Sequence, residues 1–205
     1  MGYGPTAQLA LEVGCQQSAQ RWALQQVEAA HAAARQPPAL PPELTGFNAP
    51  LPVLFEGARK ECEAVRDIRS TTPDTDSAAV QMRLRQQFLT DMGPRYFNLA
   101  MMQQAAAWRL YSASQPELEN PLLARLTEFW FNHLNVSVDK GSVRPFVGHY
   151  VLNAIRPHVL GRFDELLLAS GRHPAMLYYL DQAQSVADGT VQGNQRRGLN
   201  ENYAR

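Results

Sequence analysis

Hydrophobic residues recur at helical spacing along much of the chain. Leu122, Leu126, Phe129 and Trp130 follow the i, i+4, i+7, i+8 pattern, so they share one face of a helix that is expected to run from about Glu117 to Leu134. Similar patterns and capping residues predict further helices over residues 6–13, from 18 through 27, 55–68, from 76 or 77, 96–111, 142–155, from 157, 163–170, from 174 and from 200.

The residue composition favours helices over sheet. Ala, Leu, Gln, Glu and Arg are frequent, whereas Ile68 and Ile155 are the only isoleucines. The sequence therefore predicts an all-α fold, an irregular array of short helices. One short strand or extended turn is expected at residues 135–138, and residues 188–198 read as a loop rich in Gly, Asn and Gln.

Prolines divide the chain. Six of the 14 prolines fall within residues 36–52, a density that predicts an extended connector without helix. We therefore expect N-terminal helices over residues 1–35, a Pro-rich connector over 36–54 and a helical region over 55–205. The Ala-rich end of the N-terminal helices, near His31, is expected to face solvent.

Charge, cysteine content and hydropathy argue against several kinds of partner, site and membrane segment. Nineteen basic residues balance nineteen acidic ones and no run of like charge occurs, so no nucleic-acid partner is expected. Cys15 and Cys62 lie far apart, which argues against a zinc pair or a redox motif. The sequence has no run of about 18 consecutive apolar residues, so no membrane-spanning helix is predicted. The residues after Met1 lack the pattern of a secretory signal.

Several segments together resemble one family. In chain order they are TEFWFNH (residues 127–133), IRPH (155–158), RHPAML (172–177), YLD (179–181) and GLNENYAR (198–205). These segments are similar to the bacterial family called domain of unknown function 1800. In relatives the last of them continues into a further helix, so the resemblance implies that this chain is a truncated, incomplete domain, clipped at both ends.

The resemblance implies a cellular location and a partner, but it does not imply a particular reaction. Members are expected to be helical, often exported to the periplasm or cell envelope, and frequently encoded beside a second family with a sulfatase-like fold. The first functional hypothesis is thus a helical binding or assembly protein that acts with an exported, sulfatase-like partner at the cell envelope.

Six residues are candidates for a binding site: His133, Arg172, His173, Asn200, Glu201 and Asn202. Each also has a structural interpretation. His133 can stack on the aromatic residues before it, and His173 can cap the helix that Pro174 opens, after Gly171 has closed the preceding helix. Asn200–Asn202 can cap a helix start, where a carboxylate is favoured.

The alternative hypothesis is a metal-assisted hydrolase. His133, His173 and Glu201 would hold a divalent metal together with residues missing from this chain. His149 and His158 add to the histidines of this half, but no His-x-x-x-His or His-Glu-x-x-His spacing occurs, so convergence cannot be read from the sequence. No nucleophile elbow, phosphate loop or dinucleotide fingerprint is present, and the enzyme question stays open.

Overall fold

Helices make up most of the part of the chain that the computed structural model describes, which confirms the all-α prediction. The described residues are 11, 14, 16–71, 82, 96–187, 189–192, 195–198 and 200–204. The α-helices among them are α2 (Gln16–Ala34), α3 (Leu51–Thr71), α5 (Phe97–Ser114), α6 (Pro121–His133), α7 (Val147–Tyr150), α8 (Phe163–Arg172), α9 (Pro174–Tyr179) and α10 (Glu201–Ala204). The helices expected at residues 6–13 and from 76 or 77 lie outside the described residues.

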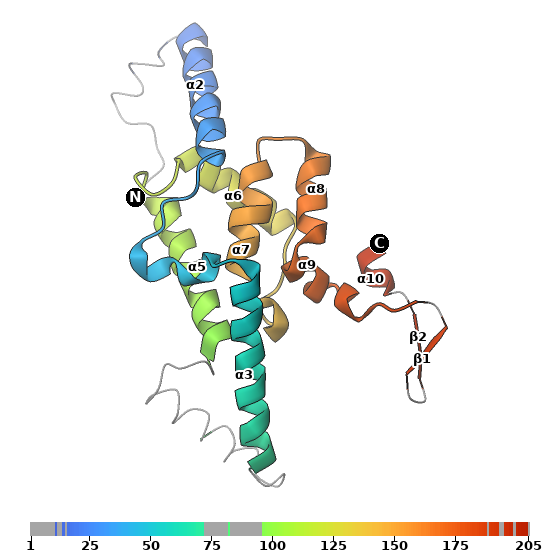
Figure 1. Ribbon diagram of the computed structural model, residues 1–205. Coiled ribbons are helices and arrows are strands. Elements are labelled where there is room, and N and C mark those ends of the chain that lie inside the picture. Colours follow the sequence, from blue (N-terminus) through green and yellow to red (C-terminus); the bar gives the residue numbers. More distant parts are fainter. Residues whose placement is uncertain are drawn as a thin grey trace.

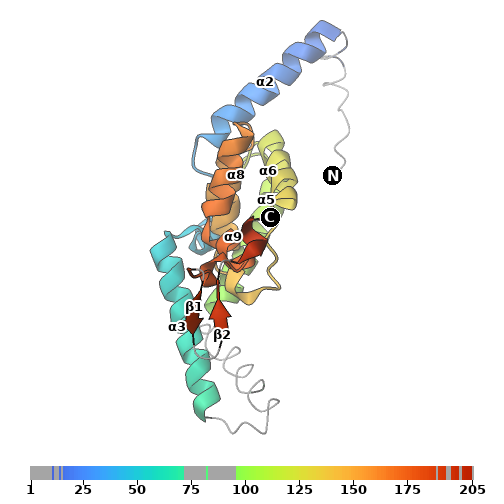
Figure 2. The same ribbon diagram turned by 90° about the vertical axis from the view of Figure 1, so that its right-hand side faces the viewer.

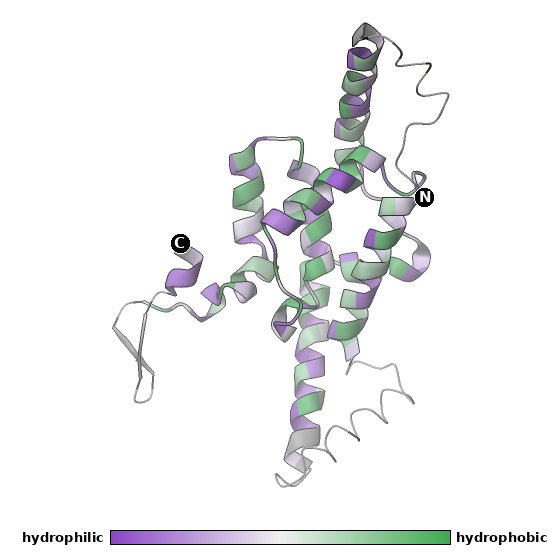
Figure 3. Cartoon of the chain, turned by 180° about the vertical axis from the view of Figure 1, so that it is seen from behind, coloured by the Kyte–Doolittle hydropathy of each residue, from purple (hydrophilic) through white to green (hydrophobic). Residues whose placement is uncertain are grey.

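Helices α5 to α9 form a central body. Figure 1 shows α2 and α3 projecting from this body in opposite directions, and the quarter-turned view in Figure 2 agrees. Green hydrophobic and purple hydrophilic residues alternate along α3 and α6 in Figure 3, as expected for helices that bury one face. No described helix combines the length and the apolarity that crossing a membrane would require.

The core is built around α7 and the wide π-helical turn that continues it, Val151–Ile155. Phe146, Tyr150 and Ile155 are each at most 2% exposed. Gly148 lets this segment approach its neighbours closely, because a Cβ atom there would lie 2.2 Å from the Phe47 ring. Both α5 and the Pro-rich stretch that carries Phe47 therefore pack against this segment.

The Pro-rich stretch is folded rather than extended. It forms two short 3-10 turns, Pro42–Leu44 and Gly46–Asn48, which bury Leu44 and Phe47. Helix α3 begins at Leu51, so the expectation that no helix forms through residue 52 was wrong. Pro52 is tolerated because the first turn of a helix needs no backbone N–H. The division into three domains stays a prediction.

One side of the Ala-rich end of α2 is buried, so the expectation that this end faces solvent holds only for its other side, where Ala29 and Ala32 are exposed. Ala30 is fully buried and Ala34 is 6% exposed where α2 meets α6. Trp22 and Leu24, on earlier turns, are 37% and 64% exposed. Small side chains allow two helix backbones to approach closely, which accounts for docking through alanine rather than through tryptophan.

The buried face of α6 differs from the predicted one. Leu123, Thr127 and Phe131 face the core at i, i+4 spacing, and the Thr127 hydroxyl donates to the Leu123 carbonyl at 2.8 Å. Phe129, on the predicted apolar face, is 51% exposed. The helix also begins later than expected, at Pro121, because the Asn120 side chain accepts hydrogen bonds from two backbone amides of the first turn.

A buried ion pair joins three parts of the fold. Arg156 and Glu119 have side chains only 4% and 3% exposed, and the Arg156 Nε lies 2.5 Å from a Glu119 oxygen. The same guanidinium donates to the Gln36 carbonyl at 2.8 Å and to the Ala33 carbonyl at 3.0 Å. The end of α2, the turn before α6 and the 3-10 turn Arg156–His158 thus share one charged centre.

The segment after α9 departs from the predicted loop. Thr190–Gln192 (β1) and Gln195–Arg197 (β2) form a short antiparallel hairpin, with Thr190 opposite Arg197. Residues 135–138 form the extended turn rather than a strand.

Gly171 lies inside the last turn of α8 and does not cap it as predicted. That helix ends at Arg172 because Pro174 requires an extended residue before it.

Replacing Arg156 by methionine should destabilise the protein by about 3–5 kcal/mol, because it leaves the Glu119 carboxylate buried without its partner. Urea unfolding measures the change. The exposed ion pair between Arg162 and Asp164 provides the matched control, and Arg162→Met should leave the midpoint nearly unchanged. Equal effects of the two substitutions would contradict the role assigned to Arg156.

Candidate functional site

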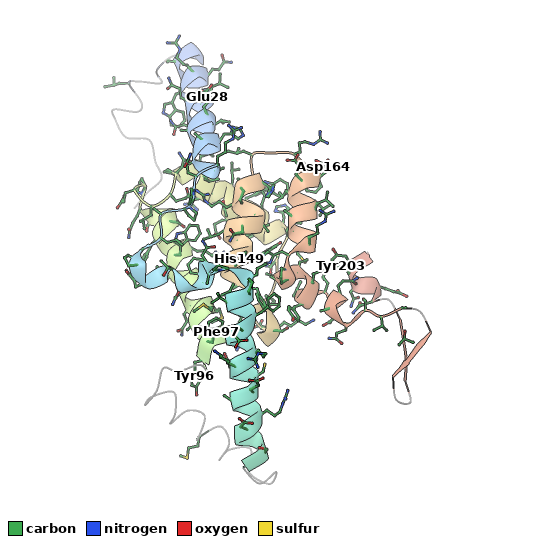
Figure 4. All side chains as sticks on the ribbon, viewed as in Figure 1. Glu28, Tyr96, Phe97, His149, Asp164 and Tyr203 are labelled. Carbon is green, nitrogen blue, oxygen red and sulfur yellow. The ribbon has the colours of Figure 1, made fainter. Side chains whose placement is uncertain are left out.

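Two histidines from different elements meet in the middle of the body. His149 of α7 and His173, the single residue between α8 and α9, lie with Nδ1 and Nε2 2.9 Å apart. Their rings are stacked, with an interplanar angle of 30°. Figure 4 shows His149 at the centre of the molecule. The residues are 24 positions apart in sequence, so only the folded chain makes this pair.

The hydrogen bonds fix the protons on this pair. The backbone N–H of Ala175 donates to His173 Nδ1 at 3.1 Å, so that nitrogen carries no proton. A neutral His173 then carries its proton on Nε2 and donates to His149 Nδ1. His149 in turn carries its proton on Nε2. Protonating either ring would break one of these bonds, so the arrangement requires both histidines to be neutral.

Burial reinforces the neutral state. It lowers the pKa of His173 from its ordinary value of 6.5 to about 3, with a smaller contribution from the nearby His149. Burial also lowers the pKa of His149. Neutral, buried and hydrogen-bonded, His173 ends α8 and starts α9, as the capping interpretation predicted.

Tyr150 and Ser170 extend the pair into a cluster. The Tyr150 hydroxyl lies 2.7 Å from both the Leu134 carbonyl and the Ser170 hydroxyl. Its one proton goes to the carbonyl, so Ser170 donates to Tyr150. Burial raises the pKa of Tyr150 to about 12. We call His149, Tyr150, Ser170 and His173 the histidine–tyrosine cluster. It fastens α8 and α9 to α7.

His133 lies at the surface in an aromatic setting. Its Nδ1 donates to the Phe129 carbonyl at 2.9 Å, and its ring centre lies 4.2 Å from that of Phe129. Trp130 is 5.7 Å from His133 and 5.6 Å from Phe163 of α8. The stacking predicted for His133 is confirmed, but on an exposed face rather than in the core.

This exposed face spans two helices. Its members are Phe129, the half-buried Trp130 and His133 of α6, and Phe163 and Leu167 of α8. Phe163 is 56% exposed, and Leu167, one turn further along, is 48% exposed. We call these five residues the aromatic surface. The sequence pattern counted Phe129 and Trp130 as one apolar face but gave no sign that α8 would continue it.

The remaining candidates lie at the ends of α8 and α10. Arg172 is exposed at the last turn of α8, and Glu201 and Asn202 are exposed on α10. Asn200 caps α10, since its side-chain oxygen accepts from the Asn202 backbone N–H at 3.0 Å. Tyr203, labelled in Figure 4, ties α10 to α8 by donating to the Gly171 carbonyl at 2.9 Å.

The proposed metal ligands do not gather in the described part of the chain. Within the described residues, no three His, Cys, Asp or Glu side chains are grouped so that they could hold a metal ion. His173 pairs with His149, whereas His133 stacks on aromatic rings. The metal-assisted hydrolase built on His133, His173 and Glu201 therefore stays a prediction that needs ligands from elsewhere.

Comparison with models of known protein families identifies the family of this chain. The family model described as a protein of unknown function, DUF1800, matches residues 1–205. The chain belongs to the DUF1800 family. Comparison with curated proteins and with solved structures finds no match. Membership agrees with the motifs quoted above and with the all-α fold, and it assigns no reaction.

Three members of the histidine–tyrosine cluster escaped the candidate list. Tyr150 and Ser170 carry no motif, and His149 lies in a stretch without ligand spacing. The signal that the sequence did offer was the position of His173 before a proline, which predicted that the His173 side chain caps the next helix. Which side chains would face that cap depends on how α7 crosses α8 and α9, and the sequence does not reveal it.

The free energy of unfolding should fall as the pH drops below about 6.5 and continue falling toward 3. The pKa of His173 is depressed in the folded state, so the unfolded chain takes up protons first. Substituting His173→Asn keeps a capping oxygen but removes the titrating ring, and should flatten this slope. Urea unfolding between about pH 7 and pH 4 measures it.

The control for this experiment is His133→Asn, which replaces an exposed histidine and should keep the slope of the unsubstituted protein. If the His173→Asn variant shows an unchanged pH dependence, the neutral histidine pair is not what couples proton uptake to unfolding.

Proposed function

We propose that this protein is a helical binding protein that docks an exported, sulfatase-like partner at the cell envelope. The observation that carries the proposal is the aromatic surface on α6 and α8. Phe129 and Phe163 each expose about half of their side chains, 51% and 56%, on a face that no described element covers. Soluble proteins seldom leave large apolar patches without a function, and such patches often mark interaction sites.

The composition of the surface supports a protein partner. Aromatic side chains dominate the energetic centres of protein interfaces because they bury large areas at a low cost in conformational entropy. Polar groups flank the surface along α8. Arg162 pairs with Asp164 beside Phe163, with Nη2 and Oδ2 2.8 Å apart. An apolar centre with charged edges is the usual design of such an interface.

His133 adds a hydrogen-bonding group to the aromatic surface. Its Nδ1 is occupied by the Phe129 carbonyl, so Nε2 is the ring nitrogen left for a partner. Stacking on Phe129 and Trp130 holds the ring in one orientation. His133, a binding candidate from the sequence, thus belongs to the proposed docking face, whereas Arg172, nine residues after Phe163, lies on about the opposite side of α8.

The histidine–tyrosine cluster supports this face from behind. Tyr150 holds Ser170 of α8 and the Leu134 carbonyl at the end of α6 through one hydroxyl. The two helices that carry the aromatic surface are therefore fixed relative to each other by a buried contact. A rigid face loses little entropy when it binds, which favours affinity.

Replacing Leu167 by serine should reduce capture of the partner without unfolding the protein, because the side chain is 48% exposed. The experiment is affinity capture from an envelope extract of the native host, with the recovered proteins identified by mass spectrometry. The matched control is Leu110→Ser on α5, where leucine is 71% exposed and lies outside the aromatic surface.

The expected result is an envelope or exported protein that the unsubstituted chain and the Leu110→Ser variant recover alike and that Leu167→Ser recovers several-fold less. Phe163→Ser should have the same effect. Repeated failure to recover any envelope or exported protein, or equal loss with both leucine variants, would count against the proposal.

A further inference from the structure

A groove of about 540 Å³ lies between α3 and the body, away from the aromatic surface. Pro52, Phe55, Arg59 and Cys62 follow helical spacing, so one face of α3 forms one wall. Opposite it lie Ser142, Pro145 and Phe146 before α7, Tyr178 of α9 and Asn98 of α5. A volume of several hundred cubic ångströms with a mostly apolar lining fits a small molecule better than a folded partner.

Three aromatic rings form the inner part of the groove. The Phe55 and Phe146 ring centres are 4.7 Å apart. Phe146 stacks on Tyr178 with an interplanar angle of 9° and ring centres 5.7 Å apart. Phe146 is 2% exposed, whereas Phe55 is 39% exposed, so the ladder runs from the core to the open groove. Phe55 is tilted by 50° to Phe146, and a planar apolar group can pack against its exposed ring in the same way.

Asn98 provides the polar signal. Its side-chain oxygen is buried and has no hydrogen-bond partner among the described residues, although the residue lines the groove. An unpaired buried acceptor is costly, and its persistence points to a group that binds there. A ligand that donates a hydrogen bond would satisfy this oxygen once the Asn98 side chain turns it toward the groove.

The position of Asn98 is fixed by its neighbours. Its backbone N–H donates to Glu61 of α3 at 2.6 Å. The preceding residue, Phe97, packs against α3 where Gly57 leaves room, since a Cβ atom there would lie 2.4 Å from the ring. Figure 4 shows Phe97 beside α3 at the start of α5. The backbone of Asn98 is thus held in place, so that only its side chain has to be ordered when a ligand binds.

We propose that this groove binds a small molecule that combines a planar apolar ring system with a hydrogen-bond donor. The rings of Phe55, Phe146 and Tyr178 take the planar part, and the Asn98 oxygen accepts from the donor. Glu56 and Arg59, paired at 2.8 Å, form a charged rim at the mouth. This proposal does not depend on the protein-docking function proposed for the aromatic surface.

Cys62 offers a direct readout. It lines the groove and is exposed, and Cys15 is the only other cysteine, so Cys15→Ser leaves one reporter thiol. Indole is the probe, and 1-methylindole, which has nearly the same ring system without the N–H donor, is its matched control. The rate at which Cys62 reacts with a thiol reagent is measured at rising probe concentration.

Indole should slow the reaction of Cys62 in a saturable manner, and 1-methylindole should need a roughly threefold to tenfold higher concentration for the same protection. Adding Asn98→Leu should remove this difference by weakening indole alone. Phe55→Ala should weaken both probes, and Phe163→Ala, on the aromatic surface, should weaken neither. Far-ultraviolet circular dichroism checks that each variant is folded.

Three results would overturn the proposal: no protection by millimolar indole, equal protection by the two probes in the protein that retains Asn98, or a Cys62 that reacts slowly without any probe. The last result would mean that another part of the chain or a second copy already fills the groove. Failure here would leave the capture experiment for the aromatic surface unaffected, because none of these variants except the Phe163→Ala control alters that surface.

Discussion

A guanidinium buried to 4% side-chain exposure is stable only if every neighbour is arranged to receive it. Arg156 meets this condition with the Glu119 carboxylate and with the carbonyls of Ala33 and Gln36. Those carbonyls are at the end of α2 and just beyond it, where helix geometry leaves oxygens without partners. One side chain therefore neutralises a buried acid and completes a helix terminus.

This constraint decides how the N-terminal part sits on the body. Because Arg156 must reach the end of α2, the last turns of that helix lie against α6 and bury Ala30 and Ala34. The earlier turns project away, with Trp22 exposed, as Figure 1 shows for the helix as a whole. The Pro-rich stretch then returns along the body and inserts Phe47 against Gly148 and Trp108.

A second polar centre organises the other side. The histidine–tyrosine cluster links α7, α8 and α9 through side chains that are neutral and mutually hydrogen-bonded. It fixes the chain where α8 gives way to α9 and leaves the outer faces of α6 and α8 free to carry the aromatic surface. The groove beside α3 lies on a different part of the molecule, so the two proposed binding sites have separate walls.

The sequence by itself determined the helical class, most helix positions and the caps at Asn200 and His173, because these depend on interactions within a few residues. It also determined family membership through short motifs. It did not determine which face of α6 is buried, that one side of the Ala-rich end of α2 is covered, or that the prolines form turns around Phe47. The hairpin after α9 was missed because its strands are three residues each.

Only the tertiary structure brought together His149 with His173, Arg156 with Glu119, and Phe55 with Phe146 and Tyr178. The physical reason is the same in each case. Local propensity and hydrophobic period fix a helix and its faces approximately, whereas a site is made where helices cross, and the crossings follow from packing of the whole chain.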